Sequence, residues 1–526
     1  MPTASPGQTG VFRPDSDRSG DHRRAGRVLP LLIGIVIFVP ACFRLPPGVC
    51  SYDSGDLQTA CATFGLAHPP GYAGYTAIGW VICRAAEPVM TPARAVSVAC
   101  ALSMTGALVL LLRACLAVGV PTWVAAGGVL LLSQHPWVWC NTVVPEVYAP
   151  GACLTIAALY LLIRDEQGGG WWRGAAAAAL FGFAAAQRLS LMLIAPWLLA
   201  GWALATWRKK RSGRGRELTA GRFAGRAILV VLAGAVPTVL TAMLTWERFG
   251  PHVPYRCPVE MAEAQRSAGE ESGFPQDRMS QVRWVMTGEM FARLRGADFF
   301  QMRSKLRWVL AQCGLRNDLI AAGVAVVSGW GMYVLWRRSR SAAIGVVGFV
   351  AGTLAFVLEY RVHDTAADLL TLILPGSLAF LGGASELGGR ALNWVAPGAR
   401  SWLRLAAVEA CAVIAVCVVG GALMRHNHST FHADTFLRAV RLNELPPGSV
   451  ICAPWSQSRA LWYGKLVDTP RADVDIIGTD AVEAWENVRR RAADRPVYFV
   501  NAQRTSGDTG SEIAPALVRE GSPAAP

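Results

Sequence analysis

The chain has 526 residues, of which 53% are hydrophobic and 16% charged, and its formal net charge is +14. Its mean hydropathy is +0.33, whereas soluble domains carry about 25% charged residues. The apolar residues come in blocks of roughly twenty, which is long enough to cross a hydrocarbon layer about 30 Å thick as a helix. These properties exclude an ordinary soluble protein and predict a polytopic membrane protein. Its positive charge then serves topology and anionic lipid rather than nucleic acid.

The N-terminal tail, residues 1–27, contains five arginines and precedes the first apolar block. No small-residue cleavage site follows that block, so we expect a retained signal-anchor. Ten more blocks follow, all within a predicted transmembrane domain at 28–424. The eleven predicted spans are 28–43, 95–112, 121–133, 147–163, 173–187, 189–207, 227–246, 318–336, 342–359, 368–385 and 405–424.

Lys and Arg in short loops orient a membrane bundle, because cytoplasmic loops carry more of them. The loop at 208–226 holds eight, and an inside N-terminus puts that loop in the cytoplasm. The apolar stretch 72–83 is too short to span and is predicted to be interfacial or re-entrant. We therefore expect a multi-pass protein of the inner or plasma membrane, with outer loops at 44–94 and 247–316 and an extracytoplasmic C-terminal part.

The C-terminal part changes character after Leu445-Pro446-Pro447-Gly448. Short apolar runs alternate there with amphipathic stretches, a pattern typical of strands alternating with helices. The sequence predicts a small α/β domain at 425–503, followed by a disordered tail at 504–526.

Two acids in the first outer loop, Asp53 and Asp56, lie three residues apart and share a face if the segment is helical. Acids beside a membrane are costly, so a function is expected for them. The alternative is that Asp53 caps a helix and Asp56 completes its capping box. His68 precedes Pro69-Pro70 and therefore lies outside a helix interior. It is either a functional side chain or a structural turn histidine.

Further ionisable residues lie at other predicted outer helix ends. Glu146 and Tyr148 begin the span at 147–163, where an acid can also serve as a plain helix cap. Arg361, His363 and Asp368 lie at the mouth of two later spans, and Arg188 lies in a tight turn. Either arginine is a candidate ligand for a phosphate. The sequence shows no metal constellation and no nucleotide-binding glycine motif.

Asp53-Ser54-Gly55-Asp56, a helix, and Ala67-His68-Pro69-Pro70-Gly71-Tyr72 together resemble a bacterial membrane family of the GT-C glycosyltransferase superfamily. That family is related to a transmembrane O-mannosyltransferase of animals, and it usually has Glu where this chain has Asp56. Glu146-Val147-Tyr148 resembles its second acidic turn, the segment from Asp368 to Pro375 its late element, and the C-terminal part its outer domain. The resemblance implies a GT-C fold, a catalytic acid in the first outer loop, and a polyprenyl-phosphate sugar as donor.

The resulting hypothesis is a glycosyltransferase that moves a sugar, with mannose among the candidates, to a protein, glycan or lipid acceptor. Asp53 or Asp56 would be the base and His68 would position a substrate. The residues that would bind the substrate or the donor are Glu146, Tyr148, Arg188, Arg361, His363 and Asp368. No cofactor is expected, and a divalent metal requirement stays open.

Two other classes of protein compete with this hypothesis. A transporter or lipid flippase would place ionisable residues in mid-span and show symmetry between its halves. A non-catalytic envelope assembly protein would keep its function when the acids are replaced.

Overall fold

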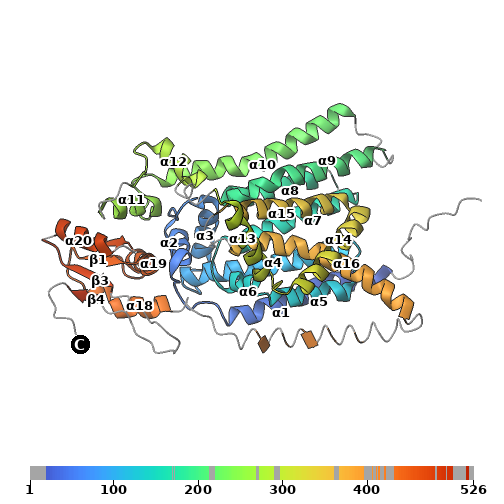
Figure 1. Cartoon of the computed structure of the whole chain (residues 1–526). Helices are drawn as coiled ribbons and strands as arrows, with labels where there is room; N and C mark the ends of the chain where they lie inside the picture. Colours follow the sequence, from blue (N-terminus) through green and yellow to red (C-terminus); the bar gives the residue numbers. More distant parts are fainter. Residues whose placement is uncertain are drawn as a thin grey trace, which may run out of the picture.

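The computed structural model describes residues 19–168, 170, 172–211, 219–267, 272–289, 296–360, 366–395, 432–479, 482–492, 494–500 and 517–519, with isolated helical positions between 406 and 421. Long helices form a bundle, and a small sheet lies beyond one of its ends (Figure 1). The predicted span at 405–424 falls largely outside the described residues, as do Arg361 and His363.

The bundle consists of helices that run roughly along one direction (Figure 1). Their bounds are α1 Ser19–Cys42, α4 Pro92–Ala117, α5 Thr122–Ser133, α6 Pro136–Val143, α7 Tyr148–Glu166, α8 Trp172–Gln187, α9 Ala195–Arg211, α10 Ala220–Arg248, α14 Asp318–Arg338, α15 Arg340–Glu359 and α16 Leu370–Val395. Short 3₁₀ turns, Leu189–Ile194 and Ala366–Leu369, precede α9 and α16.

Within the described residues, six helices are long and apolar enough to cross a membrane, and a seventh span results if α6 and α7, bent by 112°, count as one. The six are Pro92–Ala117, Leu189–Lys209, Ala220–Arg248, Asp318–Arg338, Arg340–Glu359 and Ala367–Ala391. The first and third predicted spans coincide with the shorter apolar helices Val28–Cys42 and Thr122–Ser133. The protein is therefore a mainly helical, multi-pass membrane protein, while the number of eleven spans stays a prediction.

Small residues allow some of these helices to approach closely, as is common in membrane bundles. On α8, a Cβ added at Gly182 would lie 2.0 Å from the carbonyl oxygen of Gly234 on α10. Any larger residue at this position would force α8 and α10 apart.

Shorter helices cover the bundle end that faces the sheet (Figure 1). They are α2 Tyr52–Thr63, α3 Ala73–Ala86, α11 Cys257–Ser267 and α12 Arg278–Thr287, while α13 Phe299–Gln312 packs beside α15. The stretch predicted at 72–83 is thus the fourteen-residue helix α3, which is absent from the candidate spans of the described chain.

The C-terminal part carries a four-stranded sheet in the order β2-β1-β3-β4. Strands β1 Val450–Ala453, β2 Asp475–Gly478 and β3 Val497–Val500 are parallel, and β4 Leu517–Arg519 is antiparallel to β3, with Tyr498 opposite Arg519. Helices α18 His432–Val440, α19 Trp455–Tyr463 and α20 Val482–Arg491 accompany it. The disordered tail expected at 504–526 stays a prediction, and residues 517–519 within it pair with β3.

One hydrophobic cluster joins the C-terminal part to the segment at 44–94, which was predicted to be the first outer loop. It contains buried Leu57 and Ala60 of α2 together with Ile451 of β1 and Leu461 of α19. Because this core is shared, α19 has a fixed position on α2, and side chains from both can meet.

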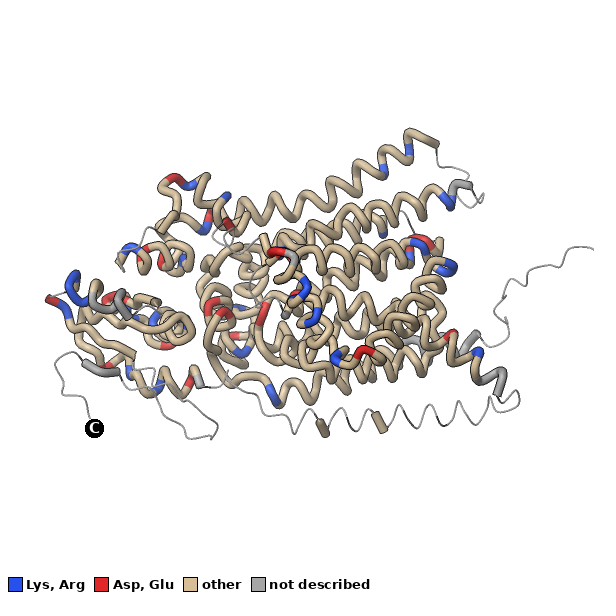
Figure 2. The backbone as a smooth tube through the Cα atoms, in the orientation of Figure 1, with Lys and Arg blue, Asp and Glu red and all other residues tan. Residues whose placement is uncertain are grey.

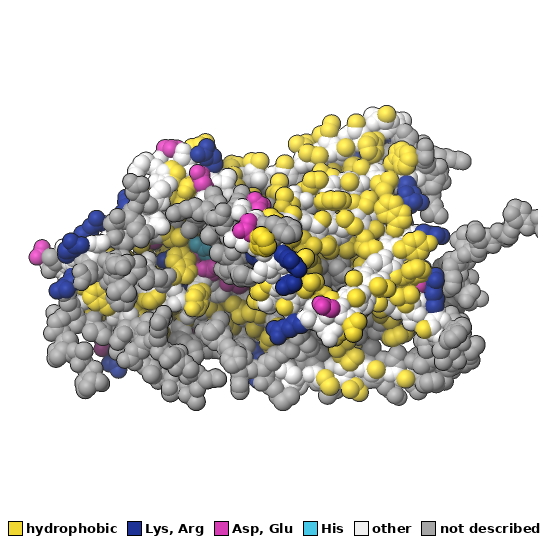
Figure 3. Space-filling model, viewed as in Figure 1, with side chains coloured by type: hydrophobic (Ala, Val, Ile, Leu, Met, Phe, Trp, Pro, Cys, Tyr) yellow, Lys and Arg dark blue, Asp and Glu magenta, His cyan; other side chains and the backbone are white. Residues whose placement is uncertain are grey.

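Charge divides the bundle into two ends (Figure 2). Basic residues gather where α7, α9, α14 and α16 finish, and the pairs Lys209–Asp165 and Arg338–Glu386 tie these ends together. Acidic residues lie at the opposite end, around α2, while hydrophobic side chains cover the outside of the bundle between them (Figure 3).

Candidate active site

The side chain of Gln58 links helix α2 to the residues before it and to the start of α4. Gln58 accepts the backbone N–H of Cys50 at 2.7 Å and donates to the carbonyl of Ala93 at 3.0 Å. A Cβ added at Gly55 would lie 2.3 Å from the carbonyl oxygen of Cys50, so only glycine fits there. These contacts fix the orientation of the two acids on either side of Gly55.

Asp56 is fully buried and accepts three hydrogen bonds. The backbone N–H of His68 donates to Oδ2 at 2.8 Å, and His68 Nδ1 lies 2.6 Å from the same oxygen. The hydroxyl of Tyr255 donates to Oδ1. Because Asp56 is buried among these donors, it is not accessible to a substrate. Its carboxylate instead orients His68 and Tyr255.

Arg459 of α19 lies behind Tyr255. Its Nη1 donates to the Tyr255 hydroxyl at 3.1 Å and to Cys257 Sγ at 3.2 Å, and its guanidinium stacks over the Trp455 ring at 3.9 Å. Arg459 is only 1% exposed. The C-terminal part therefore supplies a buried positive charge to the interior of the site.

Asp53, one turn before Asp56, has different surroundings. Its side chain is 45% exposed, and its Oδ2 lies 3.7 Å from His68 Nε2. The indole N–H of Trp455 donates to its Oδ1 at 3.0 Å. His68 thus lies between the two acids, with Nδ1 toward the buried one and Nε2 toward the exposed one.

The charges of this cluster favour an imidazolium between carboxylates. Burial lowers the pKa of His68, but the charge of Asp53 and the hydrogen bond that His68 donates to Asp56 raise it to about 9. Burial also raises the pKa of Asp56, yet the hydrogen bond and charge of His68, with Arg459 and Tyr255, bring it below its ordinary value. At neutral pH we expect a protonated His68 held by an ionised Asp56.

Glu146, in the break between α6 and α7, faces the same cluster. Ser54 donates a hydrogen bond to its Oε1 at 2.7 Å. Burial, followed by the charge of Asp53, raises the pKa of Glu146 to about 8, so that it holds a proton at neutral pH. A protonated carboxyl beside an ionised one can donate a hydrogen bond to a substrate oxygen.

A buried ion pair joins α8 to the start of α16. Arg188 Nη2 donates to Asp368 Oδ1, which also accepts from the Ser190 hydroxyl at 3.3 Å. The guanidinium lies 4.7 Å above the ring of Tyr148. Arg188 is 5% exposed, and its Nη1 has no hydrogen-bond partner among the described residues. Within the described part of the chain, this nitrogen is a buried donor without an acceptor.

Lys305 of α13 adds a second buried cation near Asp368. Its ammonium donates to the carbonyl of Tyr360. Burial lowers its pKa, while the charge of Asp368 acts in the opposite direction.

Tyr72, just before α3, connects the acidic and basic halves. Its ring packs edge-on against His68 with centroids 5.2 Å apart. Burial raises the pKa of Tyr72 well above its usual range, and Asp53, Glu146, Arg188 and Asp368 all contribute to its electrostatics. The two halves therefore form one polar site.

The capping-box alternative for Asp53 and Asp56 is wrong, whereas Glu146 lies directly before the start of α7, where its interaction with the helix dipole stays a prediction. The N-cap of α2 is Ser51 and that of α7 is Val147, and neither makes a side-chain capping bond. Asp53, Asp56 and Glu146 instead accept hydrogen bonds from Trp455, Tyr255 and Ser54.

Seven residues singled out from the sequence thus come together here: Asp53, Asp56, His68, Glu146, Tyr148, Arg188 and Asp368. Sequence reasoning missed four of their partners, which are Ser54, Tyr255, Trp455 and Arg459. In the described part of the chain, no group of three or more His, Cys, Asp or Glu is arranged to hold a metal ion.

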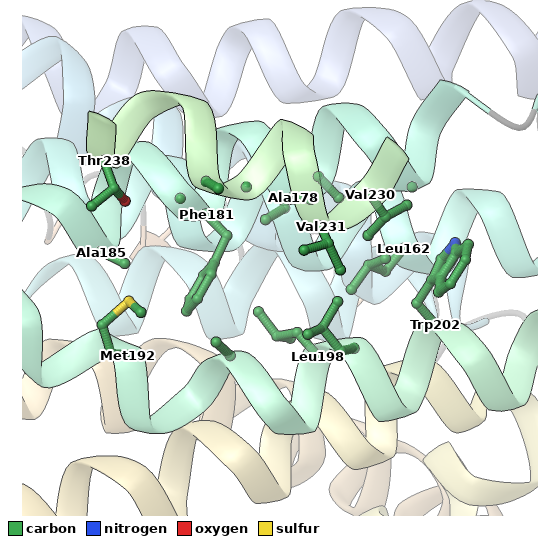
Figure 4. A pocket seen from close by; sticks show the side chains of 18 of the residues that line it. Leu162, Ala178, Phe181, Ala185, Met192, Leu198, Trp202, Val230, Val231 and Thr238 are labelled. Carbon is green, nitrogen blue, oxygen red and sulfur yellow. The ribbon is translucent and has the colours of Figure 1, made fainter. Parts of the chain in front are cut away.

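An apolar groove of about 370 Å³ runs between α7, α8, α9 and α10 (Figure 4). Ala185, Met192 and Thr238 lie at one end of it, and Trp202 lies at the other. Arg188 lies next to the first end, since its backbone N–H donates to the carbonyl of Ala185 at 3.1 Å. At this end the groove comes within one helical turn of Arg188, which is not among its lining residues.

The sequence matches no protein-family model and no curated protein. Its fold is similar to that of ArnT from Cupriavidus metallidurans, solved bound to undecaprenyl phosphate. The TM-score is 0.52 at 14% identity, and the match covers 95% of this chain and 98% of ArnT. The apo form of the same protein gives a TM-score of 0.54 at 16% identity, covering 91% and 93%. The likeness to ArnT is one of fold.

Proposed function

We propose that this protein is a membrane glycosyltransferase that transfers a sugar from a polyprenyl-phosphate donor to an acceptor at the site end of the bundle. One observation carries the proposal. A half-exposed carboxylate, Asp53, shares a polar site with a buried arginine, Arg188, whose Nη1 has no partner among the described residues, and an apolar groove ends within one helical turn of this arginine. An acid, a cation and a lipid-sized groove are what this reaction requires.

Asp53 is the base in this proposal. An acceptor hydroxyl beside its exposed carboxylate would lose its proton as the oxygen attacks the anomeric carbon. His68 and Trp455 fix the carboxylate from two sides. Asp56 has no free face and acts through His68. Of the two candidate bases, geometry thus favours Asp53.

Arg188 binds the donor phosphate. Its Nη2 donates to Asp368, so Nη1 remains for a phosphate oxygen of the donor. The positive charge of Arg188 would then stabilise the departing polyprenyl phosphate as negative charge develops on it. Lys305 adds positive charge nearby. The position of Arg361 and His363 in this site stays a prediction.

The polyprenyl chain occupies the groove of Figure 4. Met192 and Trp202 line the two ends of the groove and lie ten residues apart. At 1.5 Å of helix rise per residue, the groove is about 15 Å long. The groove is lined almost wholly by apolar side chains, so the hydrophobic effect favours a hydrocarbon chain in it. The solved structure of ArnT with undecaprenyl phosphate supports a donor of this class on a similar fold.

The orientation follows from charge. The basic helix ends lie opposite the site, so the positive-inside rule puts the site on the outer face of an inner or plasma membrane. An alkaline phosphatase fused after residue 500 should be active, and one within 212–218 should not. The reverse result would contradict this orientation.

Transfer tests the function directly. Purified protein in lipid is given a synthetic mannosyl polyprenyl phosphate and a membrane extract containing acceptors, and products are followed by mass spectrometry. We expect transfer from the lipid donor and none from the matching nucleotide sugar. Transfer from the nucleotide sugar alone would refute the proposal, and lipid movement without bond cleavage would identify a flippase.

The groove allows a sharper test. Ala235→Phe narrows it from α10, whereas Val236→Phe alters the next residue, which does not line the groove. Ala235→Phe should raise the KM for a long-chain donor about tenfold and leave a short-chain analogue unaffected. Equal effects of the two variants would argue against the groove as the tail site.

A further inference from the structure

Arg459 is a buried arginine without a carboxylate of its own. It is 1% exposed and makes no ion pair among the described residues. Its polar partners among the described residues are the Tyr255 hydroxyl, Cys257 Sγ and the neighbouring Ser458 hydroxyl. Burying a charge without a counter-charge is unfavourable for folding. Stability alone therefore does not explain this residue.

The nearest negative charge lies one hydroxyl away. Tyr255 accepts from Arg459 and donates to Asp56, and Asp56 holds the His68 ring. A phenol has a single hydrogen to donate. Because Arg459 occupies the acceptor side of Tyr255, that hydrogen is directed to Asp56.

The Tyr255 ring is itself fixed. Its backbone carbonyl accepts from Leu66 at 2.9 Å, and the carbonyl of Leu66 accepts from Cys257 at 2.9 Å. Trp462 of α19 packs against the ring with centroids 5.7 Å apart. When the ring is fixed, the Tyr255 hydroxyl can still rotate about its C–O bond. The hydrogen bond from Arg459 restricts that rotation.

We propose that Arg459 is a positioning residue, which through Tyr255 holds Asp56 against His68, so that the C-terminal part of the chain completes the site built by the first outer loop. The inference that this serves catalysis rests on the proposed function. The structural part can be tested without it.

The test is an NMR titration of the His68 ring in histidine-labelled full-length protein, with His68→Gln used to identify the signal. Three acids face this ring: Asp53 and Asp56 from α2, and Glu146 from the α6–α7 break. The variants are Tyr255→Phe and Arg459→Met. The control is Arg471→Met, which removes a C-terminal arginine that binds the carbonyls of Leu442 and Leu445, away from the site.

The pKa of His68 should change in opposite directions depending on whether the variants release Asp56 or only remove a donor or a positive charge near it. If Asp56 is released, His68 loses its hydrogen bond and its pKa falls from about 9 toward 6.5. If Asp56 stays in place, removing a donor or a positive charge strengthens its field, and the pKa rises. We expect a fall in both variants, no further fall in the double variant, and no change in Arg471→Met.

A rise, or no change, in Tyr255→Phe would overturn the proposal. This variant removes one oxygen atom and decides the question even if Arg459→Met does not fold. The catalytic part is read separately. Turnover in Tyr255→Phe should fall about tenfold or more with an unchanged KM for the mannosyl donor. A titration that shifts as expected in a protein without transferase activity would refute the function and leave the positioning intact.

Discussion

Asp53 and Asp56 are one turn apart on the same helix, yet they lie in two different regions of the site. Around Asp56 three donors approach the carboxylate, which is fully buried. Around Asp53 two directions are filled, and the side chain is 45% exposed. The difference lies in what faces each acid from elsewhere in the chain. Tyr255 and the His68 turn enclose one acid, whereas Trp455 and His68 Nε2 approach the other from two sides.

This contrast separates the role of general base from that of positioning His68, two roles that the sequence could not assign to one acid or the other. A carboxylate that exchanges a proton with a substrate needs an open face, and one that orients a histidine needs none. Asp53 fits the first role and Asp56 the second. The following predictions test this division, beginning with the largest expected effect.

Asp53→Asn should lower turnover by about 10²- to 10⁴-fold, the usual contribution of a general base. Its melting temperature should stay close to that of the parent, because the side chain is half exposed. Turnover of the mannosyl polyprenyl phosphate donor and a thermal melt measure the two quantities. Asp298→Asn, at an exposed helix start far along the chain, is the control. Near-normal turnover in Asp53→Asn would remove it as the base.

Asp56→Asn should act on folding as well. It breaks a buried charge pair with His68, which typically costs about 3–5 kcal/mol. A denaturation curve should therefore separate this variant clearly from Asp53→Asn. Equal stability of the two variants would contradict the contrast between the regions.

The pH dependence of stability should follow His68. Its pKa is raised from 6.5 to about 9, so its contribution is complete below pH 6.5 and is lost as the pH rises through 9. One proton linked to folding changes stability by about 1.4 kcal/mol per pH unit in that window. Melts between pH 6.5 and 9.5 should show this decline, and His68→Gln should flatten it. The same decline in His68→Gln would assign it to another group.

The smallest effect concerns an acid that is a true cap. Asp298 begins α13 with a capping box, accepting the N–H of Gln301 at 2.8 Å. Asp298→Ala should cost about 0.5–2 kcal/mol of stability and leave transfer unchanged. A similar outcome for Asp53→Ala would return Asp53 to the capping class.

The sequence predicted the membrane helices because their signal, a run of about twenty apolar residues, is local. It also predicted that Asp53, Asp56 and His68 belong together, since they lie within sixteen positions and share a recognisable motif. Arg188 and Asp368 were singled out separately, but nothing in their positions indicated that they pair across 180 residues.

Tyr255, Trp455 and Arg459 could not be predicted. They are ordinary residue types in stretches without a motif, and their meaning comes from contacts 199, 402 and 204 positions away. Only the packing of α19 on α2 reveals them. The local pattern also suggested caps for Asp53 and Asp56, and these tertiary contacts replaced the caps.

The shared core of α2 and α19 has a consequence for biogenesis. Synthesis begins at the N-terminus, so α2 and its acids reach the membrane surface long before α19 is made. Until then Asp56 lacks the enclosure that keeps water from it, and Asp53 lacks Trp455. The site is therefore complete only after α19 has been synthesised and has packed on α2. A chain truncated before α19 can insert into the membrane, but it lacks Trp455 and Arg459 of the site.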